Sequence, residues 1–278
     1  MTTVLKLGGE LLEDGGAMRT AAEAIVRLAA DTPLVVVHGG GRAIDAELRA
    51  RGQSPVFVDG LRVTDAATLD TVVSVLAGRN NTGLVAAIAA SGGRAIGLTG
   101  ADGRIGLSRR AAPIVTVSGR TADLGLVGEP CATDAALLAD LLKIGCIPVV
   151  ASLGVTEDGE LLNVNADVFA AHLAGVLAAK SLIVAGGTAG VLDGAGQTVG
   201  ELAVDAIDAM TASGVAHSGM IAKLVACRGA CARGVSDVRI VSGRSVADYR
   251  TAPGTRLVAA AGAAAPAEIR ACRRQPGT

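Results

Sequence analysis

One stretch, residues 34–48, limits the possible folds more than any other part of the chain. It begins with four consecutive apolar residues, Leu34–Val37, which predict a short strand buried on both faces. Three glycines, Gly39 to Gly41, come shortly after, and the apolar residues beyond them repeat with the spacing of a helix. A strand, a glycine turn and a helix in this order are typical of α/β proteins with a parallel sheet.

The glycine turn also suits an anion. Glycines leave no side chain between backbone N–H groups and a ligand, and the start of the following helix adds a partial positive charge. A bound phosphate or carboxylate and a tight turn needed only for packing both remain compatible with this stretch. The turn is not the G-x-G-x-x-G dinucleotide fingerprint, because Ile44 occupies the place of its third glycine.

Strands and helices alternate along the rest of the chain. Strands are expected at residues 3–7, 94–98, 147–151, 181–185, 238–241 and 255–258, and helices at 18–30, 84–90, 133–144, 168–179, 203–213 and 219–233. This order predicts an α/β fold with an open, mostly parallel sheet sandwiched between helices. Residues 104–130 are expected to form a small β-hairpin region, in which residues 114–117 and 124–127 are the strands.

Composition and charge exclude several classes of function. The 278 residues carry a net charge of −1, which argues against a nucleic acid or an acidic membrane as partner. No export signal and no uncharged apolar run of about 18 residues is found, so we expect a soluble, cytoplasmic protein. Five cysteines form no C-x-x-C pair, and Cys227 and Cys231 lack a second pair, which favours free thiols over a metal site.

Lysine is rare in this chain. Only four of the 25 basic residues are lysines, namely Lys6, Lys143, Lys180 and Lys223. Lys6 ends the first strand just before Gly8 and Gly9, at the sheet edge where α/β proteins bind ligands. Lys223 follows Gly219 by about one helical turn. A retained lysine in an arginine-rich chain hints that a compact ammonium group is needed there, although chance placement also explains the pattern.

Two further stretches carry polar side chains beside expected helix starts. Arg62 lies two residues before Thr64, which with Asp65 predicts a helix N-cap, and it is either a grip for a carboxylate or an ordinary surface arginine. Residues Asn163, Asn165 and Asp167 precede the helix at 168–179. One of these three is explained as an N-cap, and the other two need another role.

Five motifs in this sequence occur in the order and spacing of the amino acid kinase family. They are Lys6-Leu-Gly-Gly9, His38-Gly-Gly-Gly41, Asp59-Gly-Leu-Arg-Val-Thr64, Asn163-Val-Asn-Ala-Asp167 and Gly219-Met-Ile-Ala-Lys223. The chain resembles this family from about residue 3 to residue 258. Within the family it is most similar to the members that phosphorylate the side chain of N-acetyl-L-glutamate in arginine biosynthesis.

The resemblance implies roles for three charged residues. Lys6 and Lys223 would flank the transferred phosphoryl group, and Asp167 would hold both lysines by ion pairing. A carboxylate acceptor needs no general base, so catalysis would consist of alignment and positive charge, without a covalent intermediate.

The resemblance also implies which residues contact each ligand and which part of the chain binds each substrate. Residues implied at the acid substrate are Gly40, Gly41, Arg62 and Asn163. Residues implied at ATP, which would bind with Mg²⁺, are Gly8, Gly187, Thr188, Gly190, Val191, Leu192, Val215 and His217. Residues 1–180 would form the lobe that binds the acyl amino acid, and residues 181–278 the lobe that binds the nucleotide.

The sequence departs from the family at three places. Gly187 stands where the family usually carries an Asp, which puts ATP binding in doubt, and Asn81-Thr82 replaces a common Asn-Lys. The chain begins at its first strand, so we expect a homodimer without arginine feedback rather than an arginine-inhibited hexamer. Two alternatives stay open: a sister kinase acting on a longer acid of the aminoadipate type, and a weakened member with a regulatory role.

Overall fold

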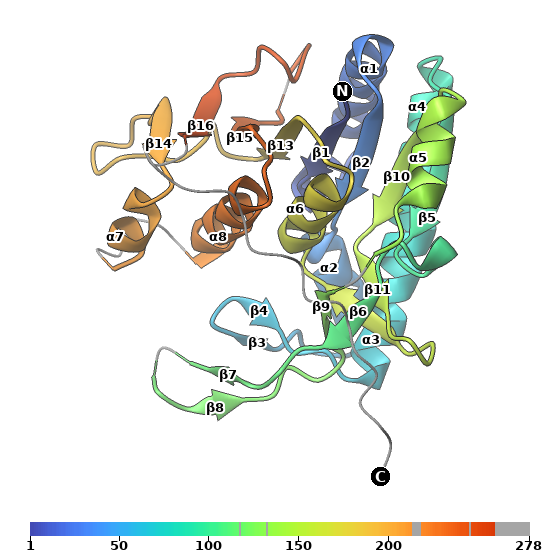
Figure 1. The fold of residues 1–278 in the computed structure, drawn as a ribbon. Helices are drawn as coiled ribbons and strands as arrows, with labels where there is room; N and C mark the ends of the chain where they lie inside the picture. The colour runs from blue at the N-terminus through green and yellow to red at the C-terminus, as the bar shows by residue number, and fades with distance from the viewer. Residues whose placement is uncertain (117, 132, 213–217, 245, 259–278) are drawn as a thin grey trace.

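An eight-stranded sheet forms the centre of the computed structural model, which describes residues 1–116, 118–131, 133–212, 218–244 and 246–258 (Figure 1). Its strands are β1 (Thr3–Leu7), β2 (Leu34–His38), β5 (Ala95–Thr99), β10 (Ile147–Ala151), β13 (Ser181–Gly186), β14 (Glu201–Ala203), β15 (Asp237–Ser242) and β16 (Gly254–Val258). They lie in the order β14-β16-β15-β13-β1-β2-β10-β5. All neighbours from β15 to β5 are parallel, which confirms the expected α/β fold.

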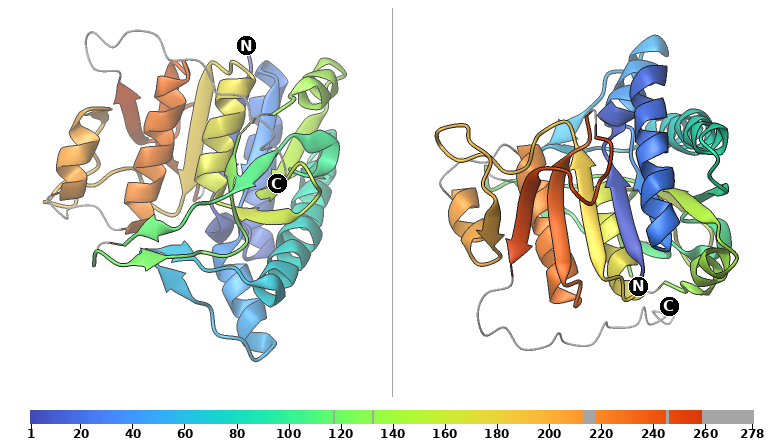
Figure 2. Two further views of the ribbon diagram at one scale, coloured as in Figure 1. Left: turned by 60° about the horizontal axis from the view of Figure 1, so that its bottom comes forward. Right: turned by 90° about the horizontal axis from the view of Figure 1, so that it is seen from above.

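Helices cover both faces of this sheet because its central strands are apolar on both sides. On one face, Val4 and Val35 belong to a core cluster that also includes residues of α5 (Ala136–Lys143), α6 (Ala166–Val176), α7 (Ala206–Ala212) and α8 (Ser218–Ala232). Their neighbours Leu5 and Val36 pack on the other face against α1 (Gly15–Asp31) and α4 (Asn81–Ala90). Figure 2 shows this three-layer arrangement from two further sides.

Smaller elements gather at the carboxyl edge of the sheet. They are η1 (Gly9–Leu11), α2 (Gly41–Ala50), α3 (Ala66–Val73), η2 (Ser74–Asn80), η3 (Asp102–Arg104), the hairpins β3 (Phe57–Val58)–β4 (Leu61–Arg62) and β7 (Ile114–Val115)–β8 (Thr121–Ala122), and a sheet of β11 (Leu153–Val155), β12 (Leu161–Val164), β9 (Val127–Pro130) and β6 (Ser108–Arg110). The two hairpins lie beyond the carboxyl ends of β1 and β2, below α6 and α8 in Figure 1. This edge is therefore where a ligand would be enclosed.

The hairpin region differs from its expected pairing. Ile114–Val115 pairs with Thr121–Ala122, whereas residues 124–126 pair with the segment around Thr64. The Thr64 N–H donates to Leu124 O at 2.9 Å, and the Leu126 N–H donates to Thr64 O at 2.7 Å. Gly125 allows this contact because its φ is +75° and a Cβ there would lie 2.4 Å from Thr64 O.

The carboxyl-terminal half of the sheet also differs from expectation at its edge. Glu201–Ala203 forms the outermost strand, β14, and α7 begins only at Ala206, so the helix expected from residue 203 is shorter. The last strand, β16, lies between β14 and β15 and runs antiparallel to β15. A strand of three residues carries too little periodicity to be separated from the start of a helix.

One continuous helical stretch, Ala66–Ala90, joins α3, η2 and α4. By length and composition alone it is apolar enough to cross a membrane. It packs instead against α1 and β5, and it carries Asp70 and Arg79. We therefore interpret it as a core helix.

The proposed boundary between the two lobes falls inside the sheet. Residues 1–180 supply β1, β2, β5 and β10, and the later residues supply β13 to β16. Strands β1 and β13 are hydrogen-bonded neighbours, with Lys6 opposite Val184, so the sheet runs without a break across the boundary.

Candidate active site

The two glycine turns that follow β1 and β2 touch each other. These strands are parallel neighbours, and a Cβ added to Gly9 would lie 2.7 Å from the Cα of Gly40. A Cβ on Gly40 would lie 2.3 Å from Nδ2 of Asn80 and 2.8 Å from Cδ2 of Leu76. Glycine is thus required at both positions by close packing, while Gly41 begins α2 and has open space around it.

Gly40→Ala is expected to destabilise the protein by about 1–3 kcal/mol, because the added methyl group overpacks the turn against Asn80 and Leu76. Gly41→Ala is the matched control, since a Cβ there meets nothing within 4 Å and the change in stability stays within about 0.5 kcal/mol. Urea denaturation of both variants measures the difference. Equal stability of the two variants would show that the turn is not packed as described.

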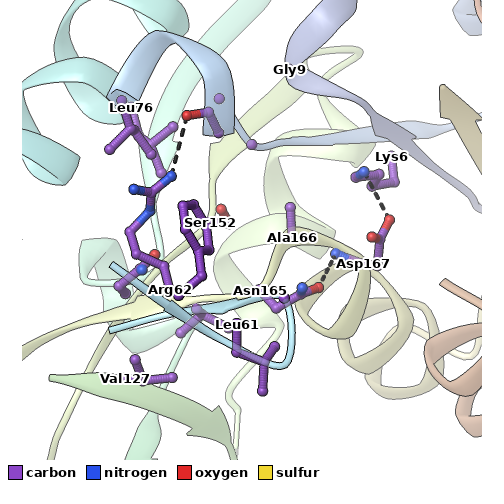
Figure 3. A pocket seen from close by; sticks show the side chains of 18 of the residues that line it. Lys6, Gly9, Leu61, Arg62, Leu76, Val127, Ser152, Asn165, Ala166 and Asp167 are labelled. Carbon is purple, nitrogen blue, oxygen red and sulfur yellow. Dashed lines mark hydrogen bonds and ion pairs between the residues drawn. The ribbon is translucent and has the colours of Figure 1, made fainter. Parts of the chain in front are cut away.

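A cavity of about 280 Å³ opens beside these turns (Figure 3). Six of the predicted site residues line it: Lys6, Gly40, Gly41, Arg62, Asn163 and Asp167. They come from β1, α2 and its cap, β4, β12 and α6. Its size is near the lower end of the range of small-molecule pockets, about 300–1,000 Å³, and suits a small ligand.

Lys6 and Asp167 form an ion pair at one end of the cavity. Nζ of Lys6 lies 2.8 Å from Oδ1 of Asp167, and the side chains are only 7 % and 10 % exposed. Asp167 is in the first turn of α6, where a negative charge is favoured by the helix dipole. A buried cation held at the carboxyl end of β1 is suited to stabilise negative charge in a ligand.

The three polar residues before α6 have three different roles. Oδ1 of Asn165 accepts from the N–H groups of Asp167 and Val168, so Asn165 is the N-cap. Asp167 pairs with Lys6, and Nδ2 of Asn163 donates to Oγ1 of Thr64 at 3.0 Å. The expectation that one of them caps the helix is confirmed, and the other two lie at the cavity.

Arg62 lies at the other end of the cavity and is not a surface arginine. Its side chain is 8 % exposed, and Nη2 lies 2.6 Å from Oδ1 of Asp45. Its guanidinium also stacks over the ring of Phe57, 4.7 Å from the centroid. Within the described part of the chain, its buried Nη1 has no hydrogen-bond partner. An unpaired buried donor of this kind is costly unless a ligand accepts from it.

Lys223 does not line the cavity. A Cβ on Gly186 would lie 3.8 Å from Cε of Lys223, which places this lysine beside the end of β13. The ion pairs among the described residues join Asp167 to Lys6 and do not join it to Lys223. The charges of Lys6, Lys223 and Asp167 all act on the thiol of buried Cys227. Burial is the largest influence and raises the pKa of this thiol, so the thiol stays protonated.

Glu10 is a site residue that sequence reasoning missed. Its Oε1 accepts a hydrogen bond from the N–H of Gly187 at 2.7 Å, and it lines the cavity next to Lys6. Burial alone would raise the pKa of Glu10, but backbone N–H groups and the charges of Lys6 and Lys223 hold it below its ordinary value. The signal available in the sequence was an acidic residue directly after Gly8-Gly9.

Those residues expected at a nucleotide that the structure describes do not line this cavity. The Gly8 N–H donates to Ala185 O at 2.8 Å. Gly190 has a φ of +121°, and the Val191 N–H donates to Oγ1 of Thr255 at 2.8 Å, so both residues have a structural role. The exposed members of the set are Thr188 and Leu192, and Val215 and His217 lie outside the described residues.

His38 ends β2 just before the glycine turn and is fully buried. Nδ2 of Asn81 donates to carbonyl oxygens of Val149 and Leu98 and lies 3.0 Å from Nε2 of His38. Since an amide nitrogen only donates, Nε2 accepts and the proton sits on Nδ1, 3.2 Å from Gly39 O. Burial lowers the pKa of His38 to about 4, and burial likewise lowers the pKa of His172 to about 4.

Stability is expected to fall as the pH is lowered from 7.5 to 5. The unfolded chain takes up protons on these histidines below its ordinary pKa near 6.5, whereas the folded chain does not until about pH 4. At pH 5, protonation of each histidine in the unfolded chain lowers the free energy of unfolding by about 2 kcal/mol. Urea denaturation at both pH values measures the loss, and His172→Gln reduces it by removing one titration. A stability independent of pH over this window would contradict neutral buried histidines.

Comparison with known proteins agrees with this geometry. A family model described as the amino acid kinase family matches residues 1–242. The chain is 43 % identical over 249 residues to a protein named acetylglutamate kinase from Sphingopyxis alaskensis, covering 87 % of this chain and 82 % of that protein. A protein of the same name from Koribacter versatilis is 39 % identical over 266 residues, covering 93 % and 99 %.

A solved structure adds a likeness in three dimensions. N-acetylglutamate synthase from Neisseria gonorrhoeae, complexed with coenzyme A and N-acetyl-glutamate, superposes with a TM-score of 0.78 at 26 % identity, covering 92 % of this chain and 59 % of that one. The family model covers most of the chain, and the relatives named above are about 40 % identical to it. The chain belongs to the amino acid kinase family.

Proposed function

We propose that this protein transfers the γ-phosphoryl group of ATP to the side-chain carboxylate of N-acetyl-L-glutamate. The product would be N-acetyl-L-glutamyl 5-phosphate, an intermediate of arginine biosynthesis. The observation that carries the proposal is that one cavity has a buried, unpaired guanidinium N–H at one end and a buried lysine at the other. Relatives named acetylglutamate kinase at about 40 % identity support it.

The acid would bind along the length of the cavity. Nη1 of Arg62 is free to donate to a carboxylate, and the guanidinium is held in place by Asp45 and Phe57 before any ligand arrives. Asn163 supplies an amide at the cavity wall, suited to the acetamido group. The side-chain carboxylate would then reach the Lys6 end, beside the N–H groups of Gly40 and Gly41.

At the Lys6 end of the cavity, positive side chains would favour phosphoryl transfer between two negatively charged substrates. A carboxylate and a triphosphate repel each other, and phosphoryl transfer spreads further negative charge over the transferred oxygens. Lys6 approaches from β1 and Lys223 from α8, so the two ammonium groups would neutralise this charge from two sides. The carboxylate attacks without losing a proton, so none of the site residues has to act as a general base.

ATP would approach from the carboxyl-terminal half, over the loop Gly187–Leu192 that follows β13. Mg²⁺ is commonly held by substrate phosphates and waters with one or two carboxylates, rather than by a protein cage. Within the described residues no group of three or more His, Cys, Asp or Glu side chains forms such a cage.

A hydroxamate assay with purified protein, MgATP and N-acetyl-L-glutamate tests the proposal. We expect turnover with this acid and a lower kcat/KM with N-acetyl-L-2-aminoadipate, which is longer by one carbon. A preference for the longer acid would identify a sister kinase. The absence of any ATP-dependent product would favour the weakened, regulatory member.

Arg62→Ala is expected to raise KM for the acid by roughly ten- to a hundredfold, because it removes a charge-assisted hydrogen bond to the ligand worth about 1.5–3 kcal/mol. The KM for ATP should change little. Steady-state kinetics with each substrate varied in turn measure the two constants, with Arg79→Ala as the control, since that arginine is 65 % exposed. A variant in which only the ATP constant moves would show that the acid binds elsewhere.

We further propose a cytoplasmic homodimer. The helix Ala66–Ala90 presents an exposed row of small residues at four-residue spacing, Ser74, Gly78, Thr82, Ala86 and Ala90. An exposed glycine inside a helix costs stability relative to alanine, by about 1 kcal/mol, and a second copy of the same helix packed closely against the row offsets this cost. Light scattering of the eluting protein measures the mass, and a monomer at micromolar concentration contradicts the dimer.

A further inference from the structure

The carboxylate of Glu10 is packed in a cradle of glycines. A Cβ added to Gly8 would lie 2.5–2.6 Å from the three atoms of this carboxyl group. A Cβ on Gly186 would lie 3.3 Å from its Oε1, and one on Gly187 would lie 3.4 Å from Cγ. The side chain of Glu10 therefore lies across the carboxyl ends of β1 and β13, which are neighbours in the sheet.

This cradle lies close to both lysines of the site. Lys6 lies on β1, two residues before Gly8, and Cε of Lys223 comes within 3.8 Å of the Cβ position of Gly186. The charges of both lysines act on Glu10 and favour its ionised form. Asp167, the other carboxylate of the site, pairs with Lys6. Two ammonium groups directed at one phosphoryl group repel each other, so a carboxylate between them lowers the cost of keeping both charged.

Position 187 provides the room and the anchor for Glu10. Gly187 offers no side chain of its own, and its N–H holds Oε1 of Glu10 at 2.7 Å. Its φ is not among the positive values of the described glycines, so an L side chain is sterically allowed there. A short acidic side chain at 187 would reach the space that Glu10 fills from the other strand.

We propose that Glu10 is the positioning residue of this site: its carboxylate, anchored on Gly187, supplies from β1's end the negative charge that holds Lys6 and Lys223 together. The expected effect of Glu10 on kcat rests on the proposed function, whereas its expected effect on the two lysines does not. A carboxylate is thus present at the end of the neighbouring strand, although position 187 itself is a glycine.

Glu10→Gln tests the charge at nearly constant shape. We expect kcat to fall roughly ten- to a hundredfold, with KM for the acid changed by less than about threefold, because misplaced charge affects the transition state most. Glu13→Gln is the matched control, since Glu13 lies just beyond η1 and pairs with exposed Arg42. The rescue variant is E10A/G187D, which moves the carboxylate to the other strand and should recover most of the rate lost in E10A.

A second measurement does not depend on turnover. With ¹³Cε-lysine labelling the four lysines give four resonances, of which Lys143 and Lys180 lie away from the site. In Glu10→Gln we expect the resonances of Lys6 and Lys223 to shift, because the charge beside them is removed, while the other two stay in place. Unchanged resonances would overturn the inference even if the enzyme were active.

The outcomes separate the inference from the function on which it rests. A wild-type protein without ATP-dependent turnover contradicts the proposed function, and the lysine resonances still decide the role of Glu10. If the wild type is active and E10Q has the same kcat, the inference is overturned and the proposed function is not. So does a variant whose only defect is a higher Mg²⁺ requirement, because Glu10 would then be a metal ligand.

Discussion

Lys6→Ala and Lys223→Ala each lower kcat by a factor of about 200 or more, while KM for the acid changes much less. This is the expected result of removing an ammonium group that acts on charge developing in the transition state, worth about 3 kcal/mol or more. Lys6 is 7 % exposed at the cavity end, where little water is present to take over its role. Steady-state and single-turnover kinetics measure the loss.

Lys143→Ala is the control for these variants, because this side chain is 74 % exposed and pairs with exposed Asp140 on the same helix. It should leave kcat unchanged. A Lys6→Ala protein that folds normally and keeps a near-normal kcat contradicts the assignment of this lysine to the reaction.

Asp167→Ala is expected to destabilise the folded protein by about 3–5 kcal/mol, because it leaves the charge of Lys6 buried without a partner. Oδ1 of Asp167 lies 2.8 Å from Nζ of Lys6, and both side chains are at least 90 % buried. Removing both charges in K6M/D167N should restore much of the loss, because no unpaired ion is left. Urea denaturation of K6M, D167N and K6M/D167N gives the coupling energy of the pair.

The exposed pair Lys143 and Asp140 provides the matched comparison. Its members are 74 % and 70 % exposed, so Asp140→Ala should cost less than about 1 kcal/mol. Equal losses in the buried and the exposed pair would show that Lys6 and Asp167 are not shielded from water as described.

Local sequence predicted the elements that depend on local signals. Strand β1 was expected at Thr3–Leu7 and is found there, because a short, mostly apolar run ends at Gly8 and Gly9. Asp65 accepts from the Thr68 N–H, as a cap before an apolar helix should. The Lys6 and Asp167 pair was expected from the family resemblance, and the structure brings these residues to 2.8 Å.

Contacts between residues far apart in the chain could not be predicted from local sequence. Residues 124–126 pair with Thr64, some 60 residues away, and no periodicity within the stretch records that partner. The short edge strand Glu201–Ala203 exists because β16 lies beside it. Glu10 belongs to the same class, since its partner Gly187 is 177 residues distant and contributes only a backbone N–H.

The most direct test of the account is a crystal structure with N-acetyl-L-glutamate, MgADP and tetrafluoroaluminate as a mimic of the transferred phosphoryl group. The account predicts that Nζ of Lys6 and Nζ of Lys223 both lie within about 3 Å of its fluorine atoms, with Glu10 between the two lysines. Lysine nitrogens directed into separate cavities, with the mimic contacting only one of them, would contradict it.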